Sequence, residues 1–306
     1  MITKRLKSGF CQKLLSSTDS PIGFVDVGSG GELKYPWDLL PKERLKKFDF
    51  EPTNETGNGL PHCISNKSGK AKFFIAKDER SSSLHEPSHE FVNRFGLDNT
   101  LTAKTVEVEL ITLDQALEGK YGQIDLMDFN VEGHDFQALE GAGKLLSQGF
   151  VKLIKIEFEL TEVWRGQKWF SDIDKFLRER KFDLANIEIE YGKPVKVRGI
   201  VHRGEPVWGK AYYVPNLDYW KEQLSAKNGK DKVTKAVVLY TLCDLPGRAI
   251  DLIDLAEHLS QSSKEEVEEL RKDIFATYRF EMLEAGGEEI KKLFLLPFKI
   301  IKRLTR

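Results

Sequence analysis

The sequence predicts an α/β fold in which strands alternate with helices, followed by a helical C-terminal extension. Up to residue 222, short apolar or alternating strand patterns take turns with segments of helical spacing. A boundary is expected at the turn of residues 227–230, which gives a sheet domain at 1–222 and a helical subdomain at 223–306. After Tyr219 only helical patterns remain, at about 230–260, 264–283 and 288–304.

Composition is that of a globular protein that can bury a large core. Of the 306 residues, 40% are hydrophobic and 31% are charged. The formal net charge of -1 gives the whole chain no electrostatic footprint for nucleic acid. Its three cysteines are far apart and form no CxxC pair, which favours a reducing compartment and argues against structural zinc. No secretory signal and no long apolar span is present, so a cytoplasmic location is expected.

The first predicted strand runs into a glycine turn. Residues 24–27, Phe-Val-Asp-Val, form the short apolar run that is typical of a central parallel strand. Gly28, Gly30 and Gly31 then let the backbone bend sharply and approach a ligand. Taken alone, the same pattern also fits an ordinary connection between a strand and a helix.

A second strand follows after a broken helix. Residues 35–47 contain Pro36 and Pro41, so only a short, interrupted helix is expected there. Residues 48–52 alternate apolar and acidic side chains and stop at a proline. This pattern predicts a strand with Glu51 at its carboxyl end.

The next segment is predicted to form two short strands and a long loop. Strands are expected at 63–65 and 72–76, with a turn at 66–69 between them. The polar stretch 78–99 is predicted to be an active-site loop or lid, with at most one helical turn at 90–95.

The remaining part of the sheet domain continues the alternation. Thr112 is predicted to cap a short helix, and residues 192–204 form a basic loop punctuated by glycines. Strands are expected at 106–110, 124–131, 151–160, 182–191 and 209–214, and helices at 115–119, 136–146 and 169–181.

Acidic residues near the first two strand ends indicate a nucleotide-like ligand. Asp26 precedes Gly28, and Glu51 lies about twenty residues beyond the glycine turn, where an acidic side chain meets a ribose in this architecture. A nicotinamide-binding turn would need a glycine at position 33, which is Leu33. The form Asp-x-Gly-x-Gly instead resembles the first motif of S-adenosylmethionine-dependent methyltransferases.

Later segments make the resemblance more specific. The segments Phe24-Val-Asp-Val-Gly28, Phe50-Glu-Pro52, Thr112-Leu-Asp114, Ile124-Asp-Leu-Met-Asp-Phe-Asn-Val-Glu-Gly133 and Leu139-Glu-Gly-Ala142 resemble, in this order, the landmarks of the FkbM family of methyltransferases. The match covers about residues 22–190. It implies a Rossmann-like seven-stranded sheet with helices on both faces, S-adenosylmethionine as methyl donor, and O-methylation of a sugar or glycan precursor.

The resemblance also implies roles for residues at the strand ends. Glu51 would bind the ribose hydroxyls, Gly28 to Gly30 would approach the methionine part, and Asp26 would help to hold its amino group. The predicted cofactor-binding set is Asp26, Gly28, Ser29, Gly30, Glu51, Ser65 and Asn130.

Three positions depart from the family pattern. Glu32 stands where the family has a glycine, Asp128 where it has lysine, and Asn130 where it has aspartate. An asparagine can hydrogen-bond but cannot act as a base, and Asp128 could replace the missing carboxylate. These departures keep open a second class of function, a non-catalytic cofactor-binding or scaffold protein with a degenerate methyltransferase fold.

Catalytic candidates cluster around the fourth landmark. Proton removal from an acceptor hydroxyl needs a base near the strand ends, and Glu132, His134 and Asp128 are the predicted catalytic residues. Glu132 also fits a structural acid at a helix start, and His134 also fits a helix cap. Further acids nearby are Asp135, Glu157 and Glu159. His85 and His89 flank Pro87 and lack a third ligand, so no metal site is expected.

The C-terminus alternates large apolar and basic residues. Residues 293–306 resemble an amphipathic segment that lies on an anionic membrane surface at the inner face, whereas docking on the domain or on a second copy is the alternative. The expected partners are therefore a small-molecule or glycan substrate, a peripheral membrane contact and a homo-oligomer, with no nucleic acid.

Overall fold

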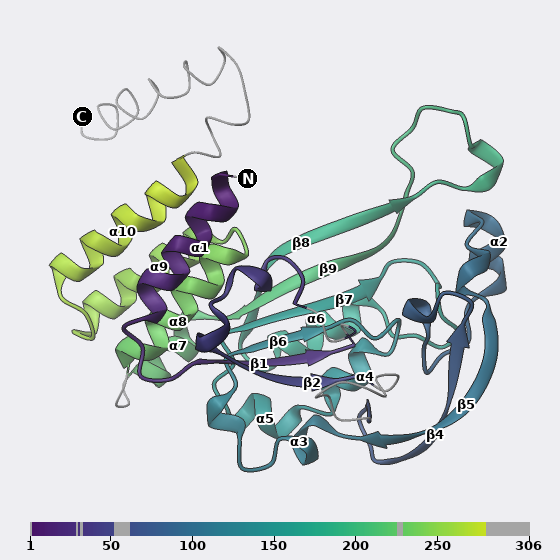
Figure 1. The fold of residues 1–306 in the computed structure, drawn as a ribbon, viewed down its shortest axis with the longest axis horizontal. Helices are drawn as coiled ribbons and strands as arrows, with labels where there is room; N and C mark the ends of the chain where they lie inside the picture. Colours follow the sequence, from purple (N-terminus) through teal and green to yellow (C-terminus); the bar gives the residue numbers. More distant parts are fainter. Residues whose placement is uncertain (1, 29, 31–32, 52–61, 225–228, 280–306) are drawn as a thin grey trace.

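A computed structural model of the protein describes residues 2–28, 30, 33–51, 62–224 and 229–279, which form a mixed α/β fold (Figure 1). The α/β prediction is confirmed. The strands are β1 Ile22–Val27, β2 Leu45–Phe50, β3 Cys63–Ile64, β4 Gly69–Ala76, β5 Thr102–Ile111, β6 Leu126–Phe129, β7 Leu153–Glu159, β8 Phe182–Gly192 and β9 Glu205–Pro215. The helices are α1 Ile2–Leu15, α2 His89–Phe95, α3 Leu113–Ala116, α4 Asp135–Glu140, α5 Gly143–Gln148, α6 Phe170–Arg178, α7 Leu217–Leu224, α8 Gly229–Leu242, α9 Pro246–His258 and α10 Lys264–Arg279.

The main sheet has the strand order β2-β1-β6-β7-β9-β8. Strands β2, β1, β6 and β7 pair in parallel, and β9 runs antiparallel to both of its neighbours. Their carboxyl ends therefore meet at one edge, where ligands bind in open α/β sheets. Among the described residues this sheet has six strands rather than the seven implied by the family resemblance.

A second, three-stranded sheet has the order β3-β5-β4. Strand β3 has only two residues, and it pairs with β5 instead of extending the main sheet. Strand β5 in turn forms an antiparallel ladder with β4 along nearly its whole length. The strands predicted at 63–65, 72–76 and 106–110 are therefore present, but they build a separate layer.

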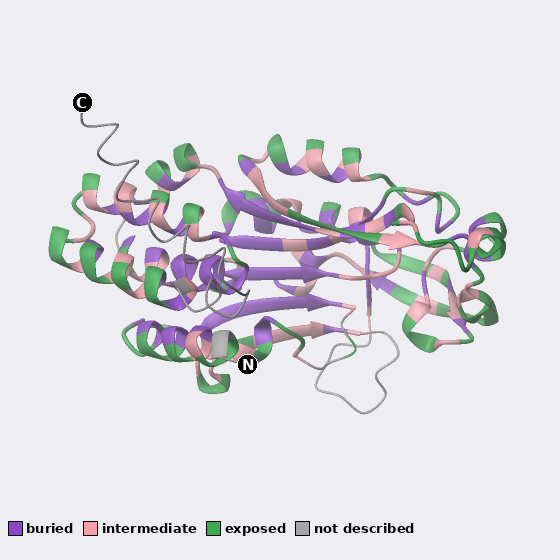
Figure 2. Cartoon of the chain, turned by 90° about the horizontal axis from the view of Figure 1, so that it is seen from above, coloured by how far each residue is buried: buried purple, intermediate pink, exposed green. Residues whose placement is uncertain are grey.

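Helices cover both faces of the main sheet, as the resemblance implies. Because strand side chains alternate between faces, Phe24 packs with the helices at the chain ends, whereas Val25 and Val27 pack with α4, α5 and α6. The central strands are buried on both sides, whereas the helices show exposed outer surfaces (Figure 2). This explains why the central strands are almost continuously apolar.

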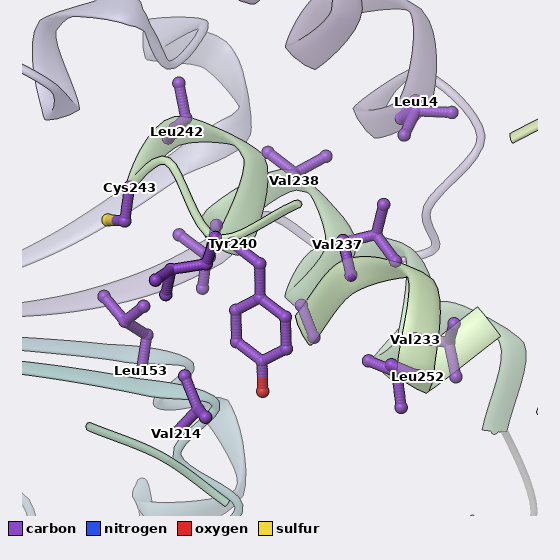
Figure 3. Close-up of a cluster of buried hydrophobic side chains, with 14 of the residues drawn as sticks. Leu14, Leu153, Val214, Val233, Val237, Val238, Tyr240, Leu242, Cys243 and Leu252 are labelled. Carbon is purple, nitrogen blue, oxygen red and sulfur yellow. The ribbon is translucent and has the colours of Figure 1, made fainter. Parts of the chain in front are cut away.

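The C-terminal helices share a core with the sheet. Val237 and Leu252 lie in the same buried cluster as Leu153 and Val214 from the strands (Figure 3). The helix predicted at 230–260 is two helices, because the chain turns at Asp244 with φ +57° and Pro246 starts α9. The predicted domain boundary after residue 222 stays a prediction, since α7 ends at Leu224 and residues 225–228 are outside the described part.

The N-terminal helix α1 was not predicted from the sequence. It packs on α8 and α10 through Phe10, Leu14 and Leu15. The basic residues of α1 suggest a solvent-exposed segment rather than a packed helix. Lys7 is nevertheless fully buried and forms an ion pair with Asp244. A buried lysine of this kind needs such a partner.

The structure bears on the predicted membrane contact only through its described helices. In the part of the chain that the structure describes, no helix is long and apolar enough to cross a bilayer. The predicted amphipathic segment at 293–306 lies outside the described residues. Membrane contact through this segment, self-association and the absence of nucleic-acid binding stay predictions.

Candidate active site

A cavity of about 680 Å³ opens at the carboxyl edge of the main sheet. Its lining comes from the glycine turn after β1, from Glu51 after β2 and from Asn130, Glu132 and His134 after β6. Residues of the segment 78–84 form another wall. The size is that of a typical small-molecule site. The structure thus brings most of the predicted strand-end residues together around one space.

Gly28 and Gly30 form the turn beneath the cavity. Gly28 has φ +88°, and a Cβ atom there would lie 2.1 Å from the carbonyl oxygen of Asn130. Its N–H donates to the carbonyl of Phe50 at 3.0 Å, which ties the ends of β1 and β2 together. Gly30 has φ +74°, and a Cβ atom there would meet no atom within 4 Å. Gly28 is therefore required by close packing, whereas Gly30 faces open space.

Glu51 lies where the sequence places it, directly after β2. Its Oε2 accepts a hydrogen bond from the Gly30 N–H at 3.2 Å, so the carboxylate reaches across the turn at the cavity wall. The neighbouring positions Ser29 and Glu32 lie outside the described residues. Asn130 also lines the cavity, and its N–H donates to the Val27 carbonyl at 2.9 Å.

Asp26 and Asp128 lie within the sheet and do not line the cavity. The two residues are neighbours in register on β1 and β6, two positions before Gly28 and Asn130. Asp26 is 2% exposed and forms an ion pair with Lys47 at 2.9 Å. The structure therefore does not bring Asp26 to the cofactor side of the turn.

Asp128 has partners of its own on the sheet face. Its Oδ2 accepts hydrogen bonds from Trp37 Nε1 at 2.6 Å and from Lys155 Nζ at 2.8 Å. These contacts hold η1, residues Trp37–Leu39, and β7 against β6. The sequence suggests that Asp128 could replace a carboxylate at position 130. This geometry gives that expectation no support, because Asn130 lines the cavity and Asp128 does not.

His134 belongs to a hydrogen-bonded chain of three side chains. Its Nε2 lies 3.0 Å from Ser65 Oγ, and its Nδ1 lies 3.1 Å from His85 Nε2. His85 Nδ1 in turn lies 3.1 Å from the carbonyl oxygen of Arg165. Because a carbonyl only accepts, the hydrogens are assigned so that His85 donates to Arg165, His134 donates to His85, and Ser65 donates to His134.

This chain keeps His134 neutral. Burial, with a smaller contribution from His85, lowers the pKa of His134 to about 3. Burial also lowers the pKa of His85. Both ring nitrogens of His134 are engaged, and the predicted cofactor contact Ser65 is buried and does not line the cavity. The sequence could not reveal this chain, because residues 65, 85 and 134 come from three separate segments.

Glu132 is the predicted catalytic residue with a carboxyl group at the cavity wall. Its backbone has φ +53°, which is unusual for a residue with a side chain, and its carbonyl accepts from Ser83 Oγ at 2.6 Å. Burial first, and then Glu157 and Asp135, raise the pKa of Glu132, whereas Lys34 opposes the shift. Glu132 is half-buried, and acids with unusual backbone geometry and a raised pKa concentrate at functional sites.

Three further acids stand behind Glu132. Burial raises the pKa of Glu157 to about 7 and that of Glu159 to about 9, and for Glu159 the neighbouring carboxylates add to the shift. Asp135 accepts hydrogen bonds from the Val131 and Gly133 N–H groups at 3.1 and 3.2 Å. Asp135 thus holds the turn that carries Glu132. Among the described residues, no three His, Cys, Asp or Glu side chains are arranged to hold a metal ion.

The wall formed by the segment 78–84 was predicted only as a loop. The structure adds Asp78, Arg80 and Ser82 from this segment to the cavity lining, together with Lys34 and His62. None of these side chains was singled out from the sequence. A signal was present only in the polarity of the segment, which carries no strand-end motif.

Comparison with known proteins identifies one family. Residues 23–184 match the family model of the methyltransferase FkbM domain. The crystal structure of the B. subtilis m1A22 tRNA methyltransferase TrmK is similar at 11% sequence identity, over 90% of this chain and 96% of that one, with a TM-score of 0.29. At that level the similarity supports no conclusion. No curated protein matches the chain.

Proposed function

This chain belongs to the FkbM methyltransferase family and is an S-adenosylmethionine-dependent methyltransferase; on that premise we propose that it methylates a hydroxyl group of a sugar or glycan precursor. The family match covers more than half of the chain and includes β1, β2, β6 and β7. The cavity at their carboxyl ends is the site of this reaction.

The residues at the cavity fit the cofactor. Glu51 lines the cavity and would accept hydrogen bonds from the two ribose hydroxyls, and a carboxylate makes such bonds strongly. The turn at Gly28 and Gly30 lets the backbone approach the ligand closely, since Gly30 has open space beside it. Bound S-adenosylmethionine supplies an electrophilic methyl group. The wall formed by the segment 78–84 is then left for an acceptor.

The polarity of that wall carries the proposal of a sugar-like acceptor. Asp78, Arg80 and Ser82 face the same cavity as His62 and Lys34. Each hydroxyl of a sugar loses its water on binding and needs a hydrogen-bond partner in return. Asp78 and Arg80 already form an ion pair with each other, and the outer hydrogens and lone pairs of such groups can still bond to sugar hydroxyls.

Glu132 is the best placed of the three catalytic candidates to take up the proton of the acceptor hydroxyl. His134 is neutral with both nitrogens engaged, and Asp128 lies below the cavity. The pKa of Glu132 is raised by burial and by its acidic neighbours, which brings it nearer to the working pH of a general base.

Calorimetry and methyl-transfer assays test the proposal in sequence. The full chain should bind S-adenosylmethionine and S-adenosylhomocysteine and should then transfer labelled methyl to members of a panel of nucleotide sugars. Glu132→Gln should lower kcat by about 10²-fold or more while leaving the affinity for S-adenosylhomocysteine unchanged. Glu140→Gln, an exposed acid on α4, is the matched control and should retain full activity.

Different failures point to different errors. Absence of binding to either cofactor form would show that the cavity is not the cofactor site. Binding without transfer to any sugar would reject the acceptor class and favour the non-catalytic scaffold. Full activity of Glu132→Gln would remove Glu132 from the reaction without affecting the acceptor.

A further inference from the structure

The β8–β9 hairpin extends beyond the edge of the sheet that carries the cavity. Pairing of β7 with β9 ends at Glu159 opposite Trp208, whereas β8 continues to pair with β9 as far as Gly192 opposite Glu205. Strand β8 runs in the same direction as β7, so its connecting loop follows the carboxyl ends of the parallel strands. Figure 1 shows this loop projecting from the molecule, on the side opposite α10. We call residues 193–204 the hairpin tip.

The hairpin tip combines positive charge with exposed apolar side chains. Its basic residues are Lys193, Lys196, Arg198 and Arg203, and it contains no Asp or Glu. All four of these basic side chains are exposed. At the far end of the loop, Ile200 is 63% exposed and Val201 is 101% exposed. Exposing large apolar side chains to water costs free energy, which would be recovered if a partner covered them.

Contacts with α2 hold the base of the hairpin tip in place. Arg198 Nη2 donates to the carbonyl of Phe95 at 3.3 Å. Arg94 binds Glu205 with an N–O distance of 2.6 Å, so the nearest acid at the hairpin is already paired. Arg203 lies over the Tyr191 ring at 4.1 Å. The apolar end therefore stands on a fixed base and is presented outward rather than folded back.

We propose that the hairpin tip docks on an anionic lipid surface. Ile200 and Val201 enter the boundary between headgroups and acyl chains, while Lys193 and Lys196 contact the lipid phosphates around them. Charge alone would also suit nucleic acid. The exposed apolar end favours lipid, because a phosphate backbone offers nothing for two aliphatic side chains to bury against.

Docking would place the cavity and the membrane on the same side of the molecule. The hairpin tip and the cavity both lie at the carboxyl ends of the parallel strands. Docking itself does not depend on the acceptor class; only the consequence that the site accepts a lipid-carried sugar rests on the proposed function. The surface is also distinct from the segment at 293–306, which follows α10 in the sequence.

Vesicle flotation of the full chain tests the docking. Wild type should float with vesicles of phosphatidylcholine and phosphatidylglycerol, and much less with phosphatidylcholine alone. Ile200→Asp and Val201→Asp should each weaken partitioning by on the order of tenfold, and Lys196→Glu by about fivefold or more. The matched control is Phe275→Asp, since Phe275 is 66% exposed but lies on α10, and it should float like wild type.

Each other outcome overturns the proposal. Failure of wild type to float, or wild-type flotation of both hairpin Asp variants, would exclude the hairpin tip as a docking site. A loss in Phe275→Asp equal to that in Ile200→Asp would place docking on the helical side. Binding of tRNA that is lost in Lys196→Glu but kept in Val201→Asp would assign the tip to nucleic acid. The affinity for S-adenosylhomocysteine should be unchanged in all variants, which separates this test from that of the active site.

Discussion

Gly28 is the residue at which the cavity tolerates least change. Replacing Gly28 with Ala would push a Cβ atom to 2.1 Å from the Asn130 carbonyl oxygen at φ +88°. We expect a loss of on the order of 3 kcal/mol in the free energy of unfolding, because backbone atoms on two strands must separate. Gly30→Ala, which meets only open space, should cost about 1 kcal/mol from its positive φ alone.

Urea denaturation of both variants checks this difference. Equal losses for Gly28→Ala and Gly30→Ala would mean that the close contact between β1 and β6 relaxes without cost. The comparison isolates close packing, because both glycines have positive φ values.

Glu51 should decide cofactor affinity. Replacing Glu51 with Gln removes the negative charge that strengthens hydrogen bonds to the ribose hydroxyls. Affinity for S-adenosylhomocysteine should fall about 10- to 100-fold in calorimetry, in line with the ~1.5–3 kcal/mol of a charge-assisted hydrogen bond. Glu79→Gln changes another acid at the cavity, on the acceptor wall, and should leave this affinity intact. An unchanged affinity in Glu51→Gln would argue against the ribose contact.

At the residue scale, the sequence could indicate positions but not partners. Glu51 and Gly28 were predictable because strand ends and glycine turns leave local patterns. The hydrogen bond from Trp37 to Asp128 and the contact of His85 with His134 join residues far apart in the chain. No local pattern encodes such pairs, so the side chains actually available to a ligand became clear only from the structure.

The contact between the segment 83–88 and the β6 side of the cavity is sensitive to acid. The segment is joined to the β6 side of the cavity by the hydrogen bond from Ser83 to Glu132 and by the His85–His134 contact. The pKa of His134 is about 3 in the folded protein, below its ordinary value of 6.5. Between these values the unfolded chain takes up a proton that the folded chain does not. Stability from this group is therefore complete above pH 6.5 and is lost as the pH falls toward 3.

Unfolding measurements at two pH values test this dependence. Lowering the pH from 6.5 to 5.0 should cost about 2 kcal/mol of unfolding free energy through His134. His134→Gln should lose this part of the dependence. His258 is exposed on α9, so His258→Gln is the control and should behave like wild type. If wild type and His134→Gln show the same pH dependence, His134 is not held neutral by its contacts with Ser65 and His85.

At the element scale, the predicted strands and helices were largely found, but not their grouping. The strands at 63–65, 72–76 and 106–110 follow from local alternation, whereas their assembly into a second sheet depends on pairing between β3 and β5. Helix α1 was not predicted, because a lysine such as Lys7 is normally expected at the surface, whereas here it is buried. Long-range partners again supply the missing information.

Asp125 connects the sheet to the C-terminal helices across the whole molecule. It accepts hydrogen bonds from the Gly23 N–H at 2.9 Å, from Lys235 Nζ at 3.3 Å and from Lys152. All three charged groups are buried. Asp125→Ala would leave two buried lysines without this carboxylate, at a cost of about 3–5 kcal/mol.

Chemical denaturation measures this cost against a surface pair. Asp183→Ala removes a more exposed ion pair with Arg248 and should cost less than about 1 kcal/mol. Asp125→Ala should also keep a single transition, because the helices and the sheet share one core. A small loss, or two separate transitions, would show that the helical region folds independently of the sheet.

The helices that cover one face of the sheet come from both ends of the chain. Helix α1 packs on α8 and α10, so its partners are the last described elements to be synthesised. A ribosome releases α1 and β1 long before residues 229–279, and until then Ile22 and Phe24 lack their covering layer. Because domains complete their folding only when all of their parts are available, this face can close only after residues 229–279 have been synthesised. The nascent chain is therefore a natural client for chaperones that shield exposed apolar surface.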